Sequence, residues 1–405
     1  MNRGWGKKKI GEVCEVVNGG TPKTGVPAYW DGPHQWITPA EMGKRTSCYI
    51  SETERTVTDL GLQNSSARLL PPHSVILSSR APIGHLLINR TPMATNQGCK
   101  GLVPNSGLDH KFLFYYLTSI VPLLNDLGSG TTFVELSGGK LKEVPVPVPP
   151  LPEQRRIVGI LNEAFEGIAT AKANAEKNLH NARAIFESYL ESVFTMRGAA
   201  WMERPLRDVC EVKDGTHDSP KYVAKGIPFV TQKNIREEGL SLENTRFISA
   251  EDHRNFYRRS NVAHGDILIS MIGANRGMAC IVDTERTFSI KNVGLVKRTE
   301  GVNHHFLLYF LKSQQAASYV RTATKGGAQE FVGLTELRGF PIPLPPLGEQ
   351  ENLADDFQKL REQSKLLESI YNRKLAALEA LKKSLLQQAF SGELTASEPL
   401  QERVA

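Results

Sequence analysis

The sequence predicts a tandem-repeat α/β protein, in which two globular α/β domains are separated by an antiparallel coiled coil of two long helices. Three observations predict this fold class. Short motifs recur about 196 residues apart along the 405-residue chain. Each copy ends in a proline-rich tract, and a long segment without proline follows each tract. A chain of this length exceeds one ordinary domain, so each copy is long enough to bury a core of its own.

The repeat consists of three pairs of matching segments. Residues 10–16 (IGEVCEV) match 206–212 (LRDVCEV), residues 112–117 (FLFYYL) match 306–311 (FLLYFL), and residues 145–151 (PVPVPPL) match 341–347 (PIPLPPL). The segments between them have diverged and differ slightly in length. We infer two copies of one domain that share a framework but differ in their loops.

The first part of each copy is expected to be a compact α/β domain. Strand-like runs such as 74–78 and 266–270 alternate with turns rich in Gly, Pro and Asn. One apolar helix is expected over 110–127 in the first copy and over 303–321 in the second. The proline tract then forms a stiff, extended exit, because proline does not fit a helix interior.

Residues 153–196 and 349–390 are expected to be helices, since they contain no proline and are rich in Ala, Leu, Glu, Gln and Lys. Their apolar positions recur alternately every four and three residues, which is typical of a coiled coil. The predicted seam runs through Ile157, Leu161, Ala175, Asn178, Ala182, Ile185 and Tyr189 in the first helix and through Leu353, Phe357, Ser364, Leu367, Leu378, Leu381 and Leu385 in the second. We expect the helices to pack against each other; the alternative is that each covers its own domain.

The excess positive charge is confined to the two α/β parts. Residues 1–150 carry a net charge of +4 and residues 204–346 one of +5, whereas the rest of the chain is at −3. This distribution is expected if both domains contact a polyanion and the helices do not. An excess this small also occurs in proteins that bind no nucleic acid.

Two proline tracts, residues 144–154 (VPVPVPPLPEQ) and 340–350 (FPIPLPPLGEQ), each precede a heptad helix. In this arrangement the chain resembles the specificity subunits of type I restriction-modification systems over nearly its whole length. The closing segment 387–394 (QQAFSGEL) also resembles the usual end of the second helix in that family. The resemblance implies target-recognition domains at 1–150 and 201–346, spacer helices at 151–200 and 347–394, and a C-terminal tail at 395–405.

The resemblance also implies a function and partners. Each target-recognition domain would read one half of a bipartite double-stranded DNA target. The spacer helices would bind two methyltransferase subunits and, through them, restriction and translocase subunits. The chain itself would be non-catalytic and hold no cofactor or metal, because the family's S-adenosylmethionine, ATP and Mg²⁺ are expected on the partners, which methylate adenine and cleave DNA.

Sequence reading needs hydrogen-bonding side chains on loops, together with contacts to phosphates. Three zones of each copy are candidates; the first also has a structural interpretation as a turn, and the third as a hydrogen-bonded strand end. The first zone comprises Gly20, Thr21 and Lys23 in one copy and Lys213, Thr216 and His217 in the other. The second comprises Thr38, Glu41, Lys44 and Arg45, and Gln232, Lys233, Asn234 and Arg236.

Within the second zone, the amides of Gln232 and Asn234 suit adenine, and Arg45 or Arg236 suits guanine or a phosphate. The third zone comprises Ser79, Arg80, Asn96, Gln97 and Lys100 in the first copy, and Ser270, Asn275, Arg276, Lys291 and Asn292 in the second. A polar loop before each proline tract, with Thr131 and Thr132 or with Lys325 and Gln329, is expected to contact phosphate.

Catalytic motifs are missing from the sequence. It has no G-x-x-x-x-G-K-[ST] phosphate loop, no glycine-rich methyl-donor loop and no Asn/Asp-Pro-Pro-Tyr tetrapeptide of adenine methyltransferases. Two alternatives stay open. One is a self-contained DNA methyltransferase or nuclease with an unrecognised site. The other is a coiled-coil adaptor, which would bind DNA in a salt-dependent but sequence-independent way.

The remaining features predict a cytoplasmic protein. Five cysteines without metal-ligand spacing are expected to be buried thiols. Neither a signal peptide nor a membrane span is expected, because the N-terminal sequence passes directly into strand-like sequence. The His304-His305 pair lacks Cys or carboxylate neighbours, so it is expected to cap a helix or lie on the surface.

Overall fold

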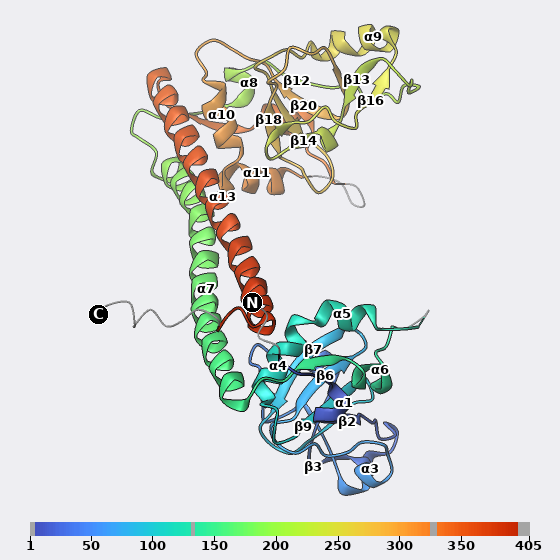
Figure 1. Ribbon diagram of the computed structural model, residues 1–405. Coiled ribbons are helices and arrows are strands. Elements are labelled where there is room, and N and C mark those ends of the chain that lie inside the picture. The colour runs from blue at the N-terminus through green and yellow to red at the C-terminus, as the bar shows by residue number, and fades with distance from the viewer. Residues whose placement is uncertain (1–4, 131–133, 325–329, 396–405) are drawn as a thin grey trace, which may run out of the picture. The chain divides into compact units, whose positions relative to one another are not determined.

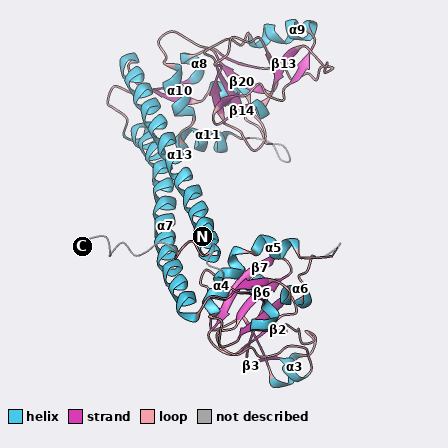
Figure 2. Ribbon diagram, viewed as in Figure 1, coloured by secondary structure: helices cyan, strands magenta, loops and turns pink. Residues whose placement is uncertain are grey.

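The computed structural model describes residues 5–130, 134–324 and 330–395. It contains two α/β domains and two long helices that pack together (Figures 1 and 2), which confirms the predicted fold class. Contacts divide the chain into two units, residues 1–174 with 374–405, and residues 175–373. Each unit therefore holds one α/β domain and half of each long helix.

The first domain is built on a five-stranded sheet with the strand order β2-β9-β6-β7-β4, beside a three-stranded sheet β5-β3-β8. Helices α4 and α5 pack on β7. The bounds are β1 (Lys7–Lys9), α1 (Ile10–Val13), β2 (Cys14–Asn18), η1 (Pro27–Tyr29), β3 (Trp30–Ile37), α2 (Pro39–Met42), β4 (Tyr49–Ile50), β5 (Arg55–Val57), α3 (Asp59–Gln63), β6 (Val75–Ser79), β7 (Ile83–Asn89), β8 (Met93–Thr95), β9 (Cys99–Pro104), α4 (His110–Ser119), α5 (Val121–Asp126), α6 (Gly138–Lys142) and β10 (Pro145–Pro147).

The second domain repeats this framework, with a sheet β12-β20-β17-β18 and a sheet β16-β13-β19. It differs from the first domain in having the ribbon β14-β15 and the 11-residue helix α9. The bounds are β11 (Met202–Pro205), α8 (Leu206–Val209), β12 (Val212–Asp214), β13 (Ile227–Val230), η2 (Gln232–Asn234), β14 (Ile235–Arg236), β15 (Gly239–Leu240), β16 (Arg246–Ile248), α9 (Ala250–Ser260), β17 (Ile267–Ser270), β18 (Ala279–Ile281), β19 (Ser289–Ile290), β20 (Val293–Val296), α10 (His304–Leu311), α11 (Gln314–Ala323), α12 (Leu334–Arg338) and β21 (Pro341–Leu344).

The single apolar helix expected in each copy is two helices, so that prediction was wrong in both. In the first domain the break lies at Ile120, just before Pro122 in the first turn of α5. A proline there lacks the N–H that would continue α4, but it fits the start of a new helix. In the second domain the side chain of Ser313 accepts a hydrogen bond from the Ala316 N–H and so begins α11.

The proline tracts are extended, as expected. Strand β10 pairs antiparallel with β1, and β21 pairs antiparallel with β11. Both are two-stranded ribbons, in which a residue without an N–H group costs few ladder hydrogen bonds. Each tract therefore ties the end of its domain to the beginning of that domain before the long helix starts.

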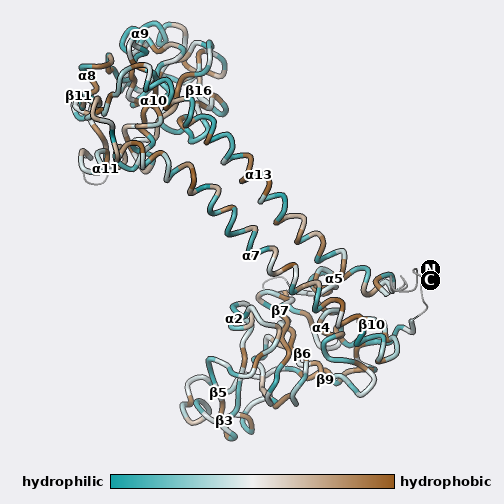
Figure 3. The backbone as a smooth tube through the Cα atoms, turned by 90° about the vertical axis from the view of Figure 1, so that its left-hand side faces the viewer, coloured by the Kyte–Doolittle hydropathy of each residue, from teal (hydrophilic) through white to brown (hydrophobic). Residues whose placement is uncertain are grey.

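The long helices are α7 (Leu151–Met196) and α13 (Leu347–Ser391), and they run antiparallel within each unit. In the first unit Lys172 Nζ lies 2.9 Å from Glu379 Oε1. In the second, Arg183 Nε lies 3.1 Å from Glu368 Oε2, and the Ser364 hydroxyl donates to the Ala182 carbonyl. Apolar and polar stretches alternate along both helices in Figure 3. The predicted pairing of the two helices is confirmed.

Beyond Ala175 the predicted seam is right at Ala182 and its partner Ser364, which are both buried, but wrong at several other positions. Asn178 is exposed, and Ile185 is 48% exposed, whereas Phe186 is buried. From Ala182 onward the buried residues follow at intervals of four, through Phe186, Leu190 and Phe194. In this stretch α7 packs against the second α/β domain as well as α13, so the strict coiled-coil spacing no longer applies. On α13, Leu367 and Leu381 are likewise exposed, at 37% and 46%.

The long helices pack against each other and also cover the domains, because the core of each α/β domain includes ends of both helices. In the first unit, Leu386 and Ala389 of α13 belong to the same core as Ile157 and Leu161 of α7. In the second unit, Phe194 of α7 packs against rings of the α/β domain and of α13. Each α/β domain is therefore completed by the start of one long helix and the end of the other.

His304 is buried, so its expected placement as a cap or a surface residue was wrong. The side chain of Asn303 caps α10 instead. The Nε2 atom of His304 accepts a hydrogen bond from the Thr299 N–H at 3.1 Å. Burial lowers the pKa of His304 to about 4, so the ring is neutral at pH 7.

In the part of the chain that the structure describes, none of the helices combines the length and the apolar character of a membrane span.

Candidate DNA interface

In the second domain, the first and third predicted zones meet between β12 and β20. Thr216 forms a bridge to Lys291, and its carbonyl accepts from the Asn292 N–H at 3.1 Å. The His217 ring lies 2.7 Å from Asn292 Oδ1, and Lys291 Nζ donates to Ser219 Oγ at 2.6 Å. Two zones that lie about 75 residues apart in sequence thus form one polar surface.

The second zone joins this surface at a cavity of about 510 Å³. Its walls include six of the predicted residues and a group that the sequence did not single out. The predicted residues are Gln232, Lys233, Asn234, Arg236, Lys291 and Asn292, and the others are Tyr222, Phe229, Thr231, Glu243, Asn244, Thr245, Arg246 and Ile272. A cavity lined by amides, cations and aromatic rings can offer hydrogen bonds to base edges and positive charge to phosphates.

The missed part of this cavity is an aromatic wall with a cation on it. The Arg246 guanidinium lies 4.5 Å from the centre of the Tyr222 ring, and Tyr222 faces Phe229 at 6.3 Å. Phe256 of α9 stacks behind Phe229 at 5.8 Å. Only the antiparallel pairing of β13 with β16 brings Arg246 here. A lysine beside an exposed tyrosine, Lys221-Tyr222, was the local signal available in the sequence.

A second cavity of about 550 Å³ shares Ile272 and Asn292 with the first. It is lined by the buried Asp214, whose carboxylate accepts two hydrogen bonds of 2.9 Å from Arg259 of α9. His217 Nε2 lies 3.0 Å from the same carboxylate. His217 therefore bridges Asp214 and Asn292, and this contact fixes the position of the Asn292 amide between the two cavities.

Asn234 has a structural role that was not predicted. It is 7% exposed, its Nδ2 donates to the Ser241 carbonyl at 3.0 Å, and its Oδ1 accepts from the Thr231 N–H at 2.9 Å. Both ends of the amide are thus occupied by the backbone, and reading adenine would require breaking these bonds. Gln232 is half-buried and Arg236 is exposed, so these two side chains of the zone are accessible to a ligand.

In the first domain, the first and third zones also meet. Asn96 Nδ2 donates to Thr21 Oγ1 at 2.9 Å, and Asn96 Oδ1 accepts from the Gly98 N–H at 2.8 Å. Gly20 is buried, and its carbonyl accepts from the Trp36 indole at 3.0 Å, so it serves packing. The side chains of Lys23 and Gln97 are exposed and free to approach a ligand.

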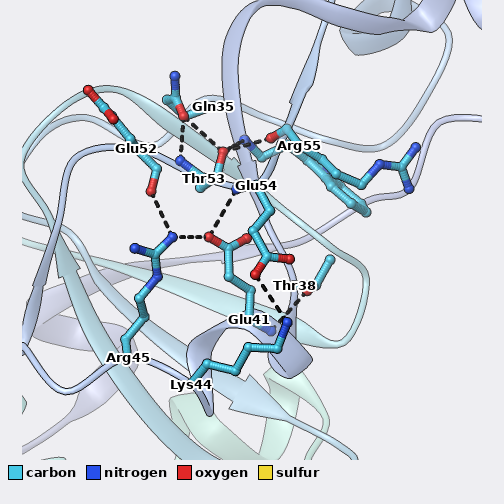
Figure 4. A network of polar contacts seen from close by, with 10 residues as sticks. Gln35, Thr38, Glu41, Lys44, Arg45, Glu52, Thr53, Glu54 and Arg55 are labelled. Atoms are coloured by element: carbon cyan, nitrogen blue, oxygen red, sulfur yellow. Dashed lines mark hydrogen bonds and ion pairs between the residues drawn. The ribbon is translucent and has the colours of Figure 1, made fainter.

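The second zone of the first domain is a hydrogen-bonded network (Figure 4). The Thr38 hydroxyl accepts from the Glu41 N–H and so caps α2. Glu41 is 2% exposed, pairs with Arg45 and accepts from the Glu54 N–H at 3.1 Å. Lys44 lies 3.1 Å from Glu54 on the surface. Glu41 was predicted to contact DNA. It is buried instead, and its carboxylate holds Arg45 and the backbone of Glu54 in place after α2.

Glu41 and Asn234 play matching parts in the two domains. Each lies three residues after a threonine that begins a short helix, and each is a buried side chain that binds the backbone of the next loop. The framework thus keeps a buried acceptor at this place while its chemistry changes. Lys44, Arg45, Gln232, Lys233 and Arg236 lie outside this buried core, since they are exposed or half-buried.

The strand ends of the third zone divide in the same way. Ser79 and Ser270 are buried, which favours the structural interpretation. Arg80 and Lys100 face Glu135, at 3.7 and 3.3 Å, and Arg276 pairs with Glu330. Asn275 is exposed, and Lys213 lies 3.1 Å from Glu211. The predicted loop residues Thr131, Thr132, Lys325 and Gln329 lie outside the described residues.

Comparison with known proteins gives the same repeat. The family described as type I restriction modification DNA specificity domain matches residues 2–179 and again 199–373. The chain belongs to this family. Each match covers one α/β domain and the first part of the long helix behind it, so the specificity domain recurs at the spacing that the sequence motifs predict.

Several relatives of known name match over much of their length. The chain is 27% identical to the type I restriction enzyme MjaIX specificity subunit of Methanocaldococcus jannaschii, over 97% of this chain and 94% of that protein. It is 23% identical to the EcoBI specificity subunit of Escherichia coli, over 75% and 70%. The first of these matches extends over nearly the whole of both chains.

Solved structures show the same fold. The HsdS subunit from Thermoanaerobacter tengcongensis matches with a TM-score of 0.66 at 19% identity, over 97% of this chain and 98% of that one. A chain from a structure concerned with complex assembly and conformational transition of the type I R-M system matches with a TM-score of 0.77 at 20% identity, over 97% and 99%. The family match makes the surface around each specificity domain's polar zones the candidate DNA interface of this chain.

Proposed function

We propose that this chain is the DNA-recognition subunit of a type I restriction-modification complex, and that its two specificity domains each read one half of a bipartite duplex target. One observation carries the proposal. In both domains, polar loops that lie far apart in sequence meet at the same place on a repeated framework, with different exposed side chains in each. A shared scaffold with different loops suits two half-sites of different sequence.

The chemistry of the first cavity, of about 510 Å³, supports this function. Lys233, Arg236, Arg246 and Lys291 bring positive charge to it, which suits the DNA backbone. Gln232 and the amide of Asn292, which His217 orients, offer donors and acceptors that suit base edges in the major groove. We assign the cations mainly to phosphates and the two amides to bases.

We propose partners for the reactions that this chain has no motif to perform. Two methyltransferase subunits would bind the long helices, and restriction and translocase subunits would bind through them. Those subunits would then bind the S-adenosylmethionine, ATP and Mg²⁺ that the reactions need. Exposed apolar side chains on α13, namely Leu366, Leu367 and Ile370, offer a surface for such a partner.

The test is to express the chain with its methyltransferase partner and to map methylated adenines across a genome. The expected result is one bipartite motif with a fixed gap. The double variant Gln232→Ala/Arg236→Ala should relax or abolish one half-site only, because each well-made base contact contributes roughly 1 to 3 kcal/mol. Arg207→Ala, on the exposed surface of α8 and outside both cavities, is the matched control.

Three outcomes would contradict the proposal. Methyl transfer or cleavage by the purified chain alone would establish the self-contained enzyme. Binding that weakens with salt but never depends on sequence would establish the adaptor. An equal loss at both half-sites in the double variant would show that the domains do not read separately.

A further inference from the structure

One carboxylate in the first domain holds two cations of the third zone. Glu135 lies 3.3 Å from Lys100 Nζ and 3.7 Å from the Arg80 guanidinium. The Lys100 side chain is only 7% exposed, whereas Glu135 and Arg80 are 36% and 33% exposed. A buried ammonium group needs an anion beside it. Glu135 supplies that anion from a side chain that reaches the solvent.

The second domain contains a corresponding pair built from other positions. Arg276, whose side chain is 20% exposed, pairs with Glu330, which is 50% exposed. The backbone register places Arg80 opposite Glu135 in the first domain but Ile272 opposite Phe331 in the second. The arginine and the glutamate have therefore moved along the chain, while an ion pair remains where the β6–β7 or β17–β18 hairpin meets the segment before α6 or α12.

Both pairs lie beside the polar surfaces described above. In the first domain Arg80 packs against Gly98, where a Cβ atom would lie 3.1 Å from the Arg80 Nε, and Gly98 is bonded to Asn96. In the second domain, the bridge formed by Ile272 and Phe331, directly after Glu330, lines one of the two cavities. The two glutamates are thus at the margin of the candidate DNA interface.

We propose that Glu135 and Glu330 occupy phosphodiester sites in the free protein and are displaced when a DNA phosphate binds the same cations. This inference rests on the proposed function and adds a specificity device to it. A phosphate carries the charge and the acceptor oxygens that a carboxylate offers to arginine and lysine. Because both glutamates are partly exposed, their carboxylates can turn toward water while the phosphate takes their place.

Displacement of the two carboxylates makes binding through the DNA backbone alone less favourable. A duplex that offers only its backbone must displace the two carboxylates, so part of its electrostatic attraction is spent on breaking ion pairs that exist already. A duplex with the correct half-sites makes base contacts in addition, and these offset the displacement. The glutamates therefore weaken binding to every duplex, so that only a duplex with the base contacts of the target is bound tightly.

The test compares Glu135→Gln and Glu330→Gln in the full chain with Glu143→Gln as the control. Glu143 forms an exposed ion pair with Lys9, so its variant makes the same change of net charge elsewhere. Binding to a labelled non-target duplex is measured by fluorescence anisotropy at several salt concentrations. Each of the first two variants should bind roughly fivefold more tightly, and the slope of log affinity against log salt should steepen by about one.

Three results would overturn the inference. One is an affinity that does not change beyond that of Glu143→Gln, another is weaker binding, and the third is a gain that survives in Arg276→Ala/Glu330→Gln, which removes the cation paired with Glu330. If Glu135→Gln unfolds because Lys100 loses its anion, the Glu330→Gln variant decides the matter alone. Wild-type protein that prefers its target duplex while the variants show no gain refutes only the displacement, whereas absence of any DNA binding refutes the proposed function as well.

Discussion

Two side chains of the second zone, Asn234 and Gln232, look alike in sequence but have different environments. We predict that Asn234→Ala lowers the free energy of unfolding by about 1 to 3 kcal/mol, because it leaves buried backbone groups without partners. Gln232→Ala should leave stability nearly unchanged and should alter one half-site. Urea denaturation and a methylation map measure the two effects. Equal stability of both variants would contradict the structural role of Asn234.

His304 makes stability depend on pH. Its pKa falls from 6.5 to about 4 on folding because burial penalises the charged ring. The folded state therefore binds fewer protons, so stability is complete above pH 6.5 and falls as the pH drops toward 4, by up to about 3 kcal/mol. His304→Gln keeps an acceptor for the Thr299 N–H but does not titrate. Between pH 7.5 and 4.5 the free energy of unfolding should change less with pH in this variant than in the wild type. An identical pH dependence would contradict the assignment.

At this scale the sequence indicated polar loops but not the environment of each side chain. The predicted residues Gln232, Arg236 and Asn292 line one cavity, and polar loops after strands are favourable sites for recognition. It could not show that Glu41 and Asn234 are buried, since a polar side chain that binds backbone and one that awaits a ligand give the same letter. Arg246 was missed because only strand pairing brings it to Tyr222.

The Glu-Gln pair at the end of each proline tract is explained by the joint between domain and helix. Gln154 and Gln350 are fully buried, and each accepts from the N–H of the residue that caps the preceding apolar helix α4 or α10, Asp109 or Asn303, at 2.8 Å. Their Nε2 atoms donate to proline carbonyls at 2.8 Å. One side chain thus fixes the start of each long helix to its domain.

We predict that Gln154→Ala or Gln350→Ala lowers stability by about 2 kcal/mol, since several buried backbone groups lose their partners. Gln363→Ala, on the exposed face of α13, is the control and should be neutral. Thermal unfolding is the measurement. A melting temperature equal to that of the control would show that the glutamine does not secure the joint.

The corrected seam makes a second prediction for the long helices. Phe186 is 6% exposed and packs against Tyr309 and Arg361, whereas its neighbour Ile185 is 48% exposed. Phe186→Ala should cost about 3 kcal/mol or more, and Ile185→Ala less than about 1 kcal/mol. Urea denaturation of the two variants checks the order. The heptad pattern favoured Ile185 because it describes contact with a partner helix and not with a domain.

For the whole molecule, both long helices pass from one contact unit into the other. We predict that the gap between half-sites follows helix length. Seven residues inserted after Ala175 and seven after Arg373 keep the heptad register and add about 10.5 Å to each helix, which equals about three base pairs at roughly 3.4 Å each. Methylation maps should show a longer gap between unchanged half-sites. An unchanged gap at full activity would show that the helices do not measure DNA.

At this scale the sequence was most informative. The repeat, the proline tracts and the two proline-free segments predicted two α/β domains and two paired helices, because these features depend on composition and period more than on detailed contacts. The contribution of helix ends to both cores was not predictable, since Phe194 and Phe390 are ordinary apolar residues in a helical pattern. Only the packed structure shows which domain each one completes.

This sharing of cores restricts genetic exchange between relatives. A recombination event that replaces the first α/β domain brings in new residues at Phe112 and Tyr116, but the ring of Phe390, 5.2 Å from each, is encoded near the other end of the gene. An imported domain folds well only if its surface accepts a helix end that has not travelled with it. Exchange of the first α/β domain is therefore expected to preserve stability only between chains in which the end of the second long helix carries a ring that fits the same place.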